Sequence, residues 1–180
     1  MQVQAANLFV PGYYMPPSKN LEADVEMLGK KTLLPQGERN YCVFNMPLVN
    51  KLVQNAEKAT PLIEKKLLSS KDEKVIAEGL YTFDRMIDAG KFDINKTYPT
   101  LSKLNDTKSA TNQVLLAGIY RKTQPPDAFG PLQKMLIQDS INPPVANFDP
   151  TEEIGGAILE YIRSAGAQKA YASASAKATL

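Results

Sequence analysis

The stretch that decides the fold is Thr60-Pro-Leu-Ile-Glu-Lys-Lys-Leu-Leu-Ser-Ser-Lys-Asp-Glu-Lys-Val75. Its apolar residues recur at spacings of three and four, which is the period of a helix that buries one face. Thr60 and Pro61 predict a helix start, with a cap followed by proline at the first helical position. Ser70 and Glu73 predict a second start, because this spacing forms a capping box. The stretch therefore indicates two consecutive helices joined by a short turn.

Helical patterns continue on both sides of this stretch. Upstream, a short helix is expected after the cap residue Asn20, and another begins at Pro47. Downstream, Pro99 is expected in the first turn of a helix and Ser109 caps the next one. The segment Asp149-Pro-Thr-Glu152 predicts the last helix start, with an acceptor at the cap and proline at the first position. The sequence thus predicts an all-α protein.

The chain divides into three parts by composition. Residues 1–45 mix large apolar groups with prolines and are expected to be an irregular segment. Residues 46–166 carry the helical period and are expected to form a right-handed stack of about three antiparallel helical hairpins. Residues 167–180 are mostly Ala, Ser and Lys and are expected to be a frayed or disordered tail.

Two markers recur along the helical part. Tyrosines stand beside aliphatic residues at Tyr81, Tyr120 and Tyr161, so the intervals are 39 and 41 residues. Gly79 and Gly118 each precede a tyrosine by two residues, in helix interiors where glycine costs about 1 kcal/mol relative to alanine. These spacings predict a structural repeat of about 40 residues. We expect a neighbouring helix to pack closely against each of the two glycines.

At these residues the chain resembles HEAT-type repeats, which are two-helix units of about 40 residues that stack into a solenoid. Pro61, the pair Leu67-Leu68 and Val75 match the family pattern. Two positions depart from it, since Ser70 stands where aspartate is usual and Ile76 where arginine is usual. The resemblance implies a curved stack whose surface binds other macromolecules.

The resemblance covers about residues 46–166. Within it, charge is unevenly distributed: residues 60–125 carry 11 Lys/Arg and 8 Asp/Glu, or +3, whereas residues 126–166 carry 2 and 6, or −4. This asymmetry favours head-to-tail contacts between molecules, although an evenly solvated surface accounts for it as well.

Composition excludes several kinds of chemistry. The chain has no histidine, which removes the commonest general base and zinc ligand. Its single cysteine, Cys42, lies in an apolar run typical of a buried thiol, and it cannot form an intramolecular disulfide. Net charge is only +2, and no apolar run reaches the length of a spanning helix. We therefore expect a cytoplasmic protein with no catalytic residue, cofactor, metal or membrane contact.

The aromatic strip near the N-terminus is the main candidate for partner binding. It consists of Phe9, Tyr13, Tyr14 and Met15. Tyrosine and methionine are favoured at interfaces. The strip either covers the chain's own first helices or binds a second molecule. The covered face would be formed by Leu48, Leu52 and Leu62.

Two charged groups are weaker candidates. A row of lysines could face phosphates, as on DNA-binding proteins of the HEAT class, although Glu64, Asp72 and Glu73 dilute its charge. This row consists of Lys65, Lys66, Lys71 and Lys74. Asp84 and Asp88 lie one turn apart, where two carboxylates could hold a cation. The favoured interpretation is that they face solvent, offset by Arg85 or a nearby lysine.

From these observations we expect a non-catalytic protein–protein interaction module, such as a scaffold, an adaptor or an assembly subunit. Its partner is another protein or a second copy of the chain. The alternative is a nucleic-acid-binding helical repeat. A third hypothesis is an enzyme that uses carboxylate or lysine chemistry, with no residue singled out for it.

Overall fold

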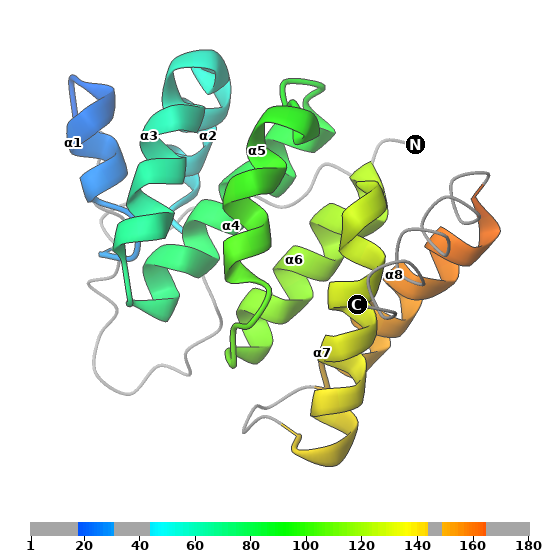
Figure 1. Ribbon diagram of the computed structural model, residues 1–180. Helices are drawn as coiled ribbons and strands as arrows, with labels where there is room; N and C mark the ends of the chain where they lie inside the picture. The colour runs from blue at the N-terminus through cyan, green and yellow to red at the C-terminus, as the bar shows by residue number, and fades with distance from the viewer. Residues whose placement is uncertain (1–17, 31–43, 144–148, 165–180) are drawn as a thin grey trace, which may run out of the picture.

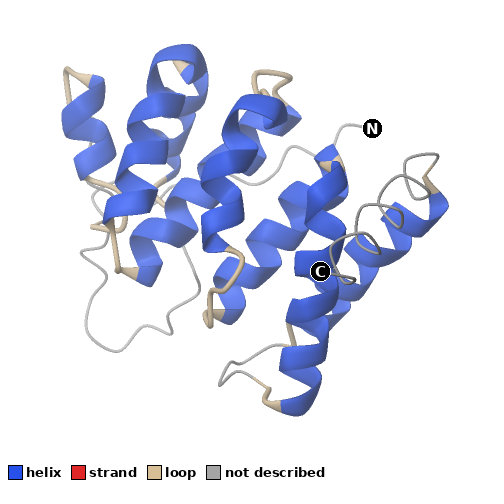
Figure 2. Ribbon diagram, viewed as in Figure 1, coloured by secondary structure: helices blue, strands red, loops and turns tan. Residues whose placement is uncertain are grey.

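The computed structural model describes residues 18–30, 44–143 and 149–164. These residues form eight α-helices and two short 3₁₀ turns, and no strand occurs among them (Figure 2). The prediction of an all-α protein is confirmed. The strip formed by Phe9, Tyr13, Tyr14 and Met15 lies outside the described residues, as do Cys42 and the tail 167–180.

The helices follow one another across the molecule in chain order (Figure 1). They are α1 (Leu21–Glu26), α2 (Met46–Gln54), α3 (Ala56–Ser69), α4 (Glu73–Asp88), α5 (Ile94–Leu101), α6 (Ala110–Thr123), α7 (Phe129–Ile141) and α8 (Thr151–Arg163). The 3₁₀ turns are Ser102–Leu104 after α5 and Pro126–Ala128 directly before α7. The even-numbered helices pack side by side, α2 on α4, α4 on α6 and α6 on α8, while α1 packs on α3 and α3 on α5.

One continuous core lies between these helices. Its largest buried side chains include Phe83 of α4, Tyr120 of α6, and the pair of Phe129 and Tyr161 on α7 and α8. Leu28 brings α1 into the same core, so the predicted short helix after Asn20 is part of the folded body. The core therefore extends through all eight described helices.

Pro47 lies in the first turn of α2, close to the predicted start, but two other prolines do not start their helices. Pro61 is the sixth residue of α3, and Pro99 is the sixth residue of α5. A proline within a helix removes one backbone hydrogen bond, here the bond to the carbonyl of Glu57 or Asn95. Both of these residues are exposed, so water can satisfy the freed carbonyl. The two predicted start positions were wrong because an exposed second turn tolerates proline.

The predicted capping box at Ser70 was also wrong. Ser70 is the residue at which α3 ends, and α4 begins at Glu73. The cap of α4 is Asp72, whose carboxylate accepts a hydrogen bond from the backbone N–H of Lys74 at 2.9 Å. Aspartate caps a helix as well as serine does. Because α4 begins after Asp72 rather than after Ser70, the chain has room to turn between α3 and α4.

Other helix starts agree more closely with the sequence. The side chain of Asn20 accepts from the backbone N–H of Ala23 at 2.7 Å and caps α1, as predicted. Asp149 accepts from the backbone N–H of Thr151 at 2.9 Å, although α8 begins at Thr151 rather than at Pro150. Each carboxamide or carboxylate satisfies a backbone donor that has no partner within the helix.

The repeated aromatic position differs from the predicted one. Tyr120 and Tyr161 are each the eleventh residue of their helix and are buried. In α4 the eleventh residue is Phe83, also buried, whereas Tyr81 is half-exposed and stacks on Phe44. Tyr81 was therefore assigned wrongly, because a two-residue offset turns a helical side chain by about 160° to another face.

The two interior glycines also differ from each other. A Cβ atom added at Gly79 would lie 2.6 Å from Cδ2 of Leu67, which confirms close contact between α3 and α4. Among the described residues, the nearest atom to a Cβ added at Gly118 is Oε1 of Glu153 at 4.0 Å, so the tight helix contact predicted there was wrong.

Candidate interaction surface

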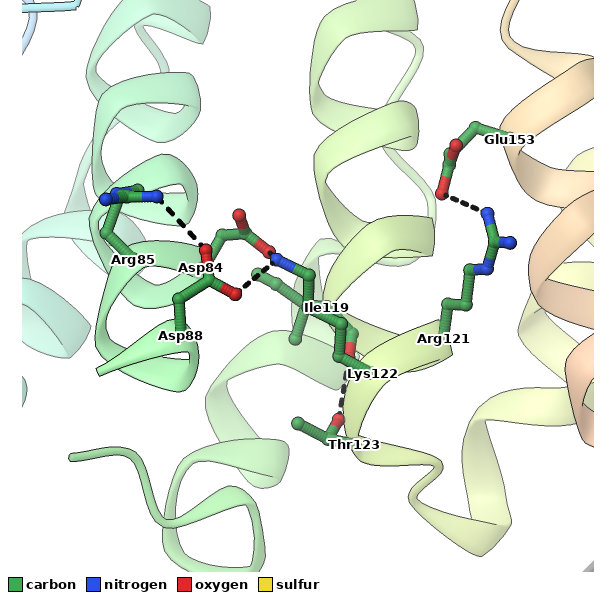
Figure 3. Close-up of polar contacts among 8 residues, drawn as sticks. All are labelled: Asp84, Arg85, Asp88, Ile119, Arg121, Lys122, Thr123 and Glu153. Carbon is green, nitrogen blue, oxygen red and sulfur yellow. Dashed lines mark hydrogen bonds and ion pairs between the residues drawn. The ribbon is translucent and has the colours of Figure 1, made fainter. Parts of the chain in front are cut away.

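Asp84 and Asp88 of α4 are both paired with a lysine of α6. The Nζ atom of Lys122 lies 2.7 Å from Oδ1 of Asp84 and 2.8 Å from Oδ1 of Asp88 (Figure 3). Arg85 pairs with the other oxygen of Asp88 at 3.1 Å. Burial disfavours the charge of Lys122, but its hydrogen bonds and attraction to the two carboxylates outweigh this and raise its pKa. The favoured prediction for the two aspartates, neutralisation by neighbouring bases, is confirmed.

A second ion pair continues this row to α8. Nη1 of Arg121 lies 3.4 Å from Oε1 of Glu153, and Figure 3 shows it on the side of α6 that faces α8. Partly exposed pairs of this kind contribute little stability each. These ion pairs link α4 to α6 and α6 to α8. Because their charges are largely neutralised, they leave little free charge to bind a ligand. Among the described residues, no cluster of three or more potential metal ligands occurs.

A groove of about 730 Å³ lies between the start of α3 and the start of α5. Its charged lining residues are Glu57, Lys58, Glu64, Lys91, Asp93 and Lys96. Three carboxylates and three ammonium groups give it no net charge, and Asp93 is already engaged as the cap of α5. Burial raises the pKa of Glu64. The groove therefore shows no preference for a ligand of either charge.

The predicted lysine row is only partly available. Lys66 pairs with Glu26 of α1, with 2.6 Å between Nζ and Oε2. That hydrogen bond and the charge of Lys66 lower the pKa of Glu26. The other three lysines are exposed, and so is the side chain of Leu68, which lies between Lys65 and Lys71 in the chain. We define the basic ridge as Lys65, Leu68, Lys71 and Lys74.

The last helix pair exposes most of the large apolar side chains that reach solvent. Among the described residues five such side chains are exposed, and four belong to α7 and α8. We define the terminal apolar face as these four: Ile137 (59% exposed), Ile141 (70%), Leu159 (51%) and Ile162 (47%). The fifth is Leu68 of the basic ridge (44%).

Packing of α8 against α7 determines which of its residues face outward. Ile154, Ala157 and Tyr161 are buried. The hydroxyl of Tyr161 donates to the carbonyl oxygen of Pro125 at 2.7 Å, and its ring lies 5.8 Å from that of Phe129. With these residues facing inward, the helical period turns Leu159 and Ile162 away from the core.

Sequence reasoning missed this face. Ile162 and Leu68 both fit the apolar spacing of their helices, but both are exposed. Ile137 and Ile141 of α7 are the two most exposed of these side chains. Their signal was available, because they are four residues apart and lie off the face formed by Leu132 and Met135.

The expected seat of the N-terminal strip is the face formed by Leu48, Leu52 and Leu62. Leu48 and Leu52 are fully buried in the core, and Leu62 is half-buried. The strip itself lies outside the described residues, so its contact with this face stays a prediction.

Comparisons with known proteins give no further guide. The chain matches no family model, no curated protein and no solved structure. Within the described residues, no helix is both long and apolar enough to cross a membrane. Function must therefore be inferred from the surfaces themselves.

Proposed function

We propose that this chain is a non-catalytic protein–protein interaction module that binds its partner through the terminal apolar face. The observation that carries the proposal is the concentration of four exposed aliphatic side chains on one helix pair. Exposed apolar surface is costly in water, and larger patches mark binding sites on soluble proteins. Each of these side chains would gain on the order of 1 kcal/mol on burial, given that roughly half of it is exposed.

We further propose that the module is a short helical repeat of the HEAT type. Support comes from two positions that recur in register. Proline is the sixth residue of α3, of α5, and of the segment that starts at Pro126 and continues into α7. A buried aromatic residue is the eleventh of α4, α6 and α8. In such an array each pair buries its faces against its neighbours, so a last pair with an apolar outer surface offers a place for a partner.

The test replaces the two most exposed residues of the face. The double variant Ile137→Lys, Ile141→Lys should keep the melting temperature of the parent, because both side chains already lie in solvent. It should lose the protein that co-purifies with the parent from the native source. The control is Gln133→Lys, which adds one positive charge at an exposed position of the same helix, compared with two in the double variant. Equal recovery of the partner with the double variant would contradict the proposal.

The aromatic strip Phe9, Tyr13, Tyr14 and Met15 remains a proposed second contact with the partner. A chain lacking residues 1–17 should melt at nearly the same temperature and bind the partner more weakly. A large loss of stability instead would identify the strip as an intramolecular cap.

Nucleic-acid binding is the second candidate, because Lys65, Lys71 and Lys74 are exposed together. Phosphate contacts release counterions, so binding to DNA or RNA would weaken steeply with salt. A titration of the parent protein with a labelled oligonucleotide at two salt concentrations distinguishes this candidate from protein binding.

A further inference from the structure

We infer that the surface on which α1 packs is also a self-recognition site, which accepts α1 from a second copy of this chain and so forms a domain-swapped dimer. None of the residues involved belongs to the terminal apolar face, so the inference goes beyond the function proposed above. We define the α1 site as the side chains of the body that meet residues 18–30: Lys51 of α2, Lys66 of α3, and Val75 and Glu78 of α4.

Charged groups hold α1 in this site. Oδ2 of Asp24 lies 2.5 Å from Nζ of Lys51, and the same ammonium group donates to the carbonyl oxygen of Ser18. Asp24 is fully buried, so its charge requires a base at this place. A second carboxylate, that of Glu26, lies 2.6 Å from Nζ of Lys66. The site therefore offers two ammonium groups at the positions that the acidic residues of α1 need.

The end of α1 meets an equally selective part of the site. The backbone N–H of Gly29 donates to Oε2 of the buried Glu78 at 2.7 Å. Gly29 has a φ of +77°, a conformation that side chains other than glycine rarely adopt. A Cβ atom added there would also lie 2.9 Å from the backbone nitrogen of Val75. The site therefore fits a helix that is followed by glycine at this distance.

These requirements identify the occupant. A helix of another sequence would lose the bonds to Lys51 and Glu78, and buried polar groups disfavour ligands that leave them with fewer bonds. A second copy of the chain supplies an α1 that meets every requirement. Swapping an identical element between two molecules is a low-cost route to a dimer, because each site keeps the contacts that it had before.

Among the described helices, α1 is the one best suited to exchange. It is the shortest, with six residues, and it lies at one end of the row of helices (Figure 1). A helix of this length does not form alone in water, so α1 depends on an α1 site in its own or another molecule. Residues 31–43 join it to α2 and lie outside the described residues. Thirteen residues can span up to about 45 Å, which is enough to reach a neighbouring molecule.

A pair of charge variants tests the exchange. Asp24→Lys and Lys51→Asp each place like charges together, so α1 should not bind within its own molecule in either variant. When the two are mixed, each α1 meets an opposite charge in the site of the other variant. Sedimentation should show each variant alone as a monomer and the equimolar mixture as a dimer, with association at least about tenfold tighter in the mixture.

The control mixture combines Asp24→Lys with Lys103→Asp, which makes the same charge change at an exposed lysine outside the α1 site. This mixture should remain monomeric, because no site in it has gained a negative charge. Circular dichroism melts verify that every variant is folded. If both variants of the main pair are folded and their mixture remains monomeric, the exchange does not occur.

The parent chain provides a measurement that does not depend on the folding of any variant. Refolding from denaturant at about 1 mM, which is comparable to the effective concentration of a tethered α1, should give a dimer that is absent after refolding at about 1 μM. Only monomer at both concentrations would overturn the inference. The function proposed for the terminal apolar face would still stand, because its test concerns different residues.

Discussion

The carboxylate of Glu78 on α4 accepts a hydrogen bond from the backbone N–H of Asn45, with 2.5 Å between Oε1 and N. Its other oxygen accepts from the backbone N–H of Gly29 at 2.7 Å. Glu78 is buried, so these donors replace the water that an ionised carboxylate requires. One side chain thereby joins the end of α1 and the start of α2 to the body of the protein.

Replacing Glu78 by alanine should destabilise the protein by about 2–3 kcal/mol, because the buried N–H of Asn45 and the half-buried N–H of Gly29 both lose their acceptor. Chemical denaturation followed by circular dichroism measures the change. Glu57→Ala, at an exposed position on α3, is the control and should change stability by less than about 0.5 kcal/mol. Similar losses for both variants would show that Glu78 contributes no more than a surface carboxylate.

The two interior glycines should respond oppositely to alanine. Gly79→Ala places a Cβ atom 2.6 Å from Cδ2 of the buried Leu67, and we expect a loss of about 1–3 kcal/mol from overpacking. Gly118→Ala places a Cβ atom no closer than 4.0 Å to its nearest described neighbour, Oε1 of Glu153, so the higher helix propensity of alanine should add about 1 kcal/mol. Thermal melts of the two variants measure both changes in stability. A loss at Gly118 would mean that its side of α6 is more crowded than the described residues show.

Asn112 should be replaceable by an apolar residue with a gain in stability. It is fully buried on α6, and neither its amide nitrogen nor its amide oxygen has a hydrogen-bond partner among the described residues. It is the third residue of α6, and the third residue of α4 is the buried Val75. Asn112→Leu should therefore stabilise the protein by about 1–2 kcal/mol, since the cost of burying an unpaired amide disappears. Denaturant titration measures the change, and the dependence of the unfolding free energy on denaturant concentration should stay the same. A loss of stability would argue for a buried water bound to Asn112.

Stability should fall at alkaline pH because of three tyrosines. Burial raises the pKa of Tyr98 to about 12, helped by the charge of Asp127, and burial also raises the pKa of Tyr120 and Tyr161. The unfolded chain loses these protons near pH 10, whereas the folded chain retains them. Stability is therefore complete below pH 10 and declines as pH rises from 10 towards 12, by up to about 1.4 kcal/mol per pH unit for each tyrosine.

The variant Tyr161→Phe isolates one of these contributions. It removes one ionisable group, so its free energy of unfolding should fall less steeply than that of the parent between pH 10 and 11.5. Below pH 9 the variant should be less stable by about 1 kcal/mol, owing to the lost hydrogen bond to Pro125. Identical slopes for the two proteins would mean that Tyr161 ionises as readily in the folded state as in the unfolded state.

The sequence by itself determined which segments are helical. Apolar spacing and capping residues such as Asn20 act through bonds between near neighbours, so they can be recognised without knowledge of the fold. Local sequence signals gave the wrong helix start where the start depends on whether neighbouring residues are buried or exposed. Pro61 lies inside α3 because the carbonyl that it leaves free belongs to an exposed residue, and exposure is a tertiary property.

Only the tertiary structure decided which apolar side chains face solvent. Leu67 and Leu68 are adjacent and chemically identical, yet the first contacts Gly79 in the core and the second lies on the basic ridge. The helical period turns consecutive residues by about 100°, but the direction of the core is set by the packing of α4 against α3. Glu78 shows the same dependence, because its two donors come from residues 33 and 49 positions away in the chain. These residues come into contact only when the helices have packed, so a local sequence pattern does not predict their hydrogen bonds.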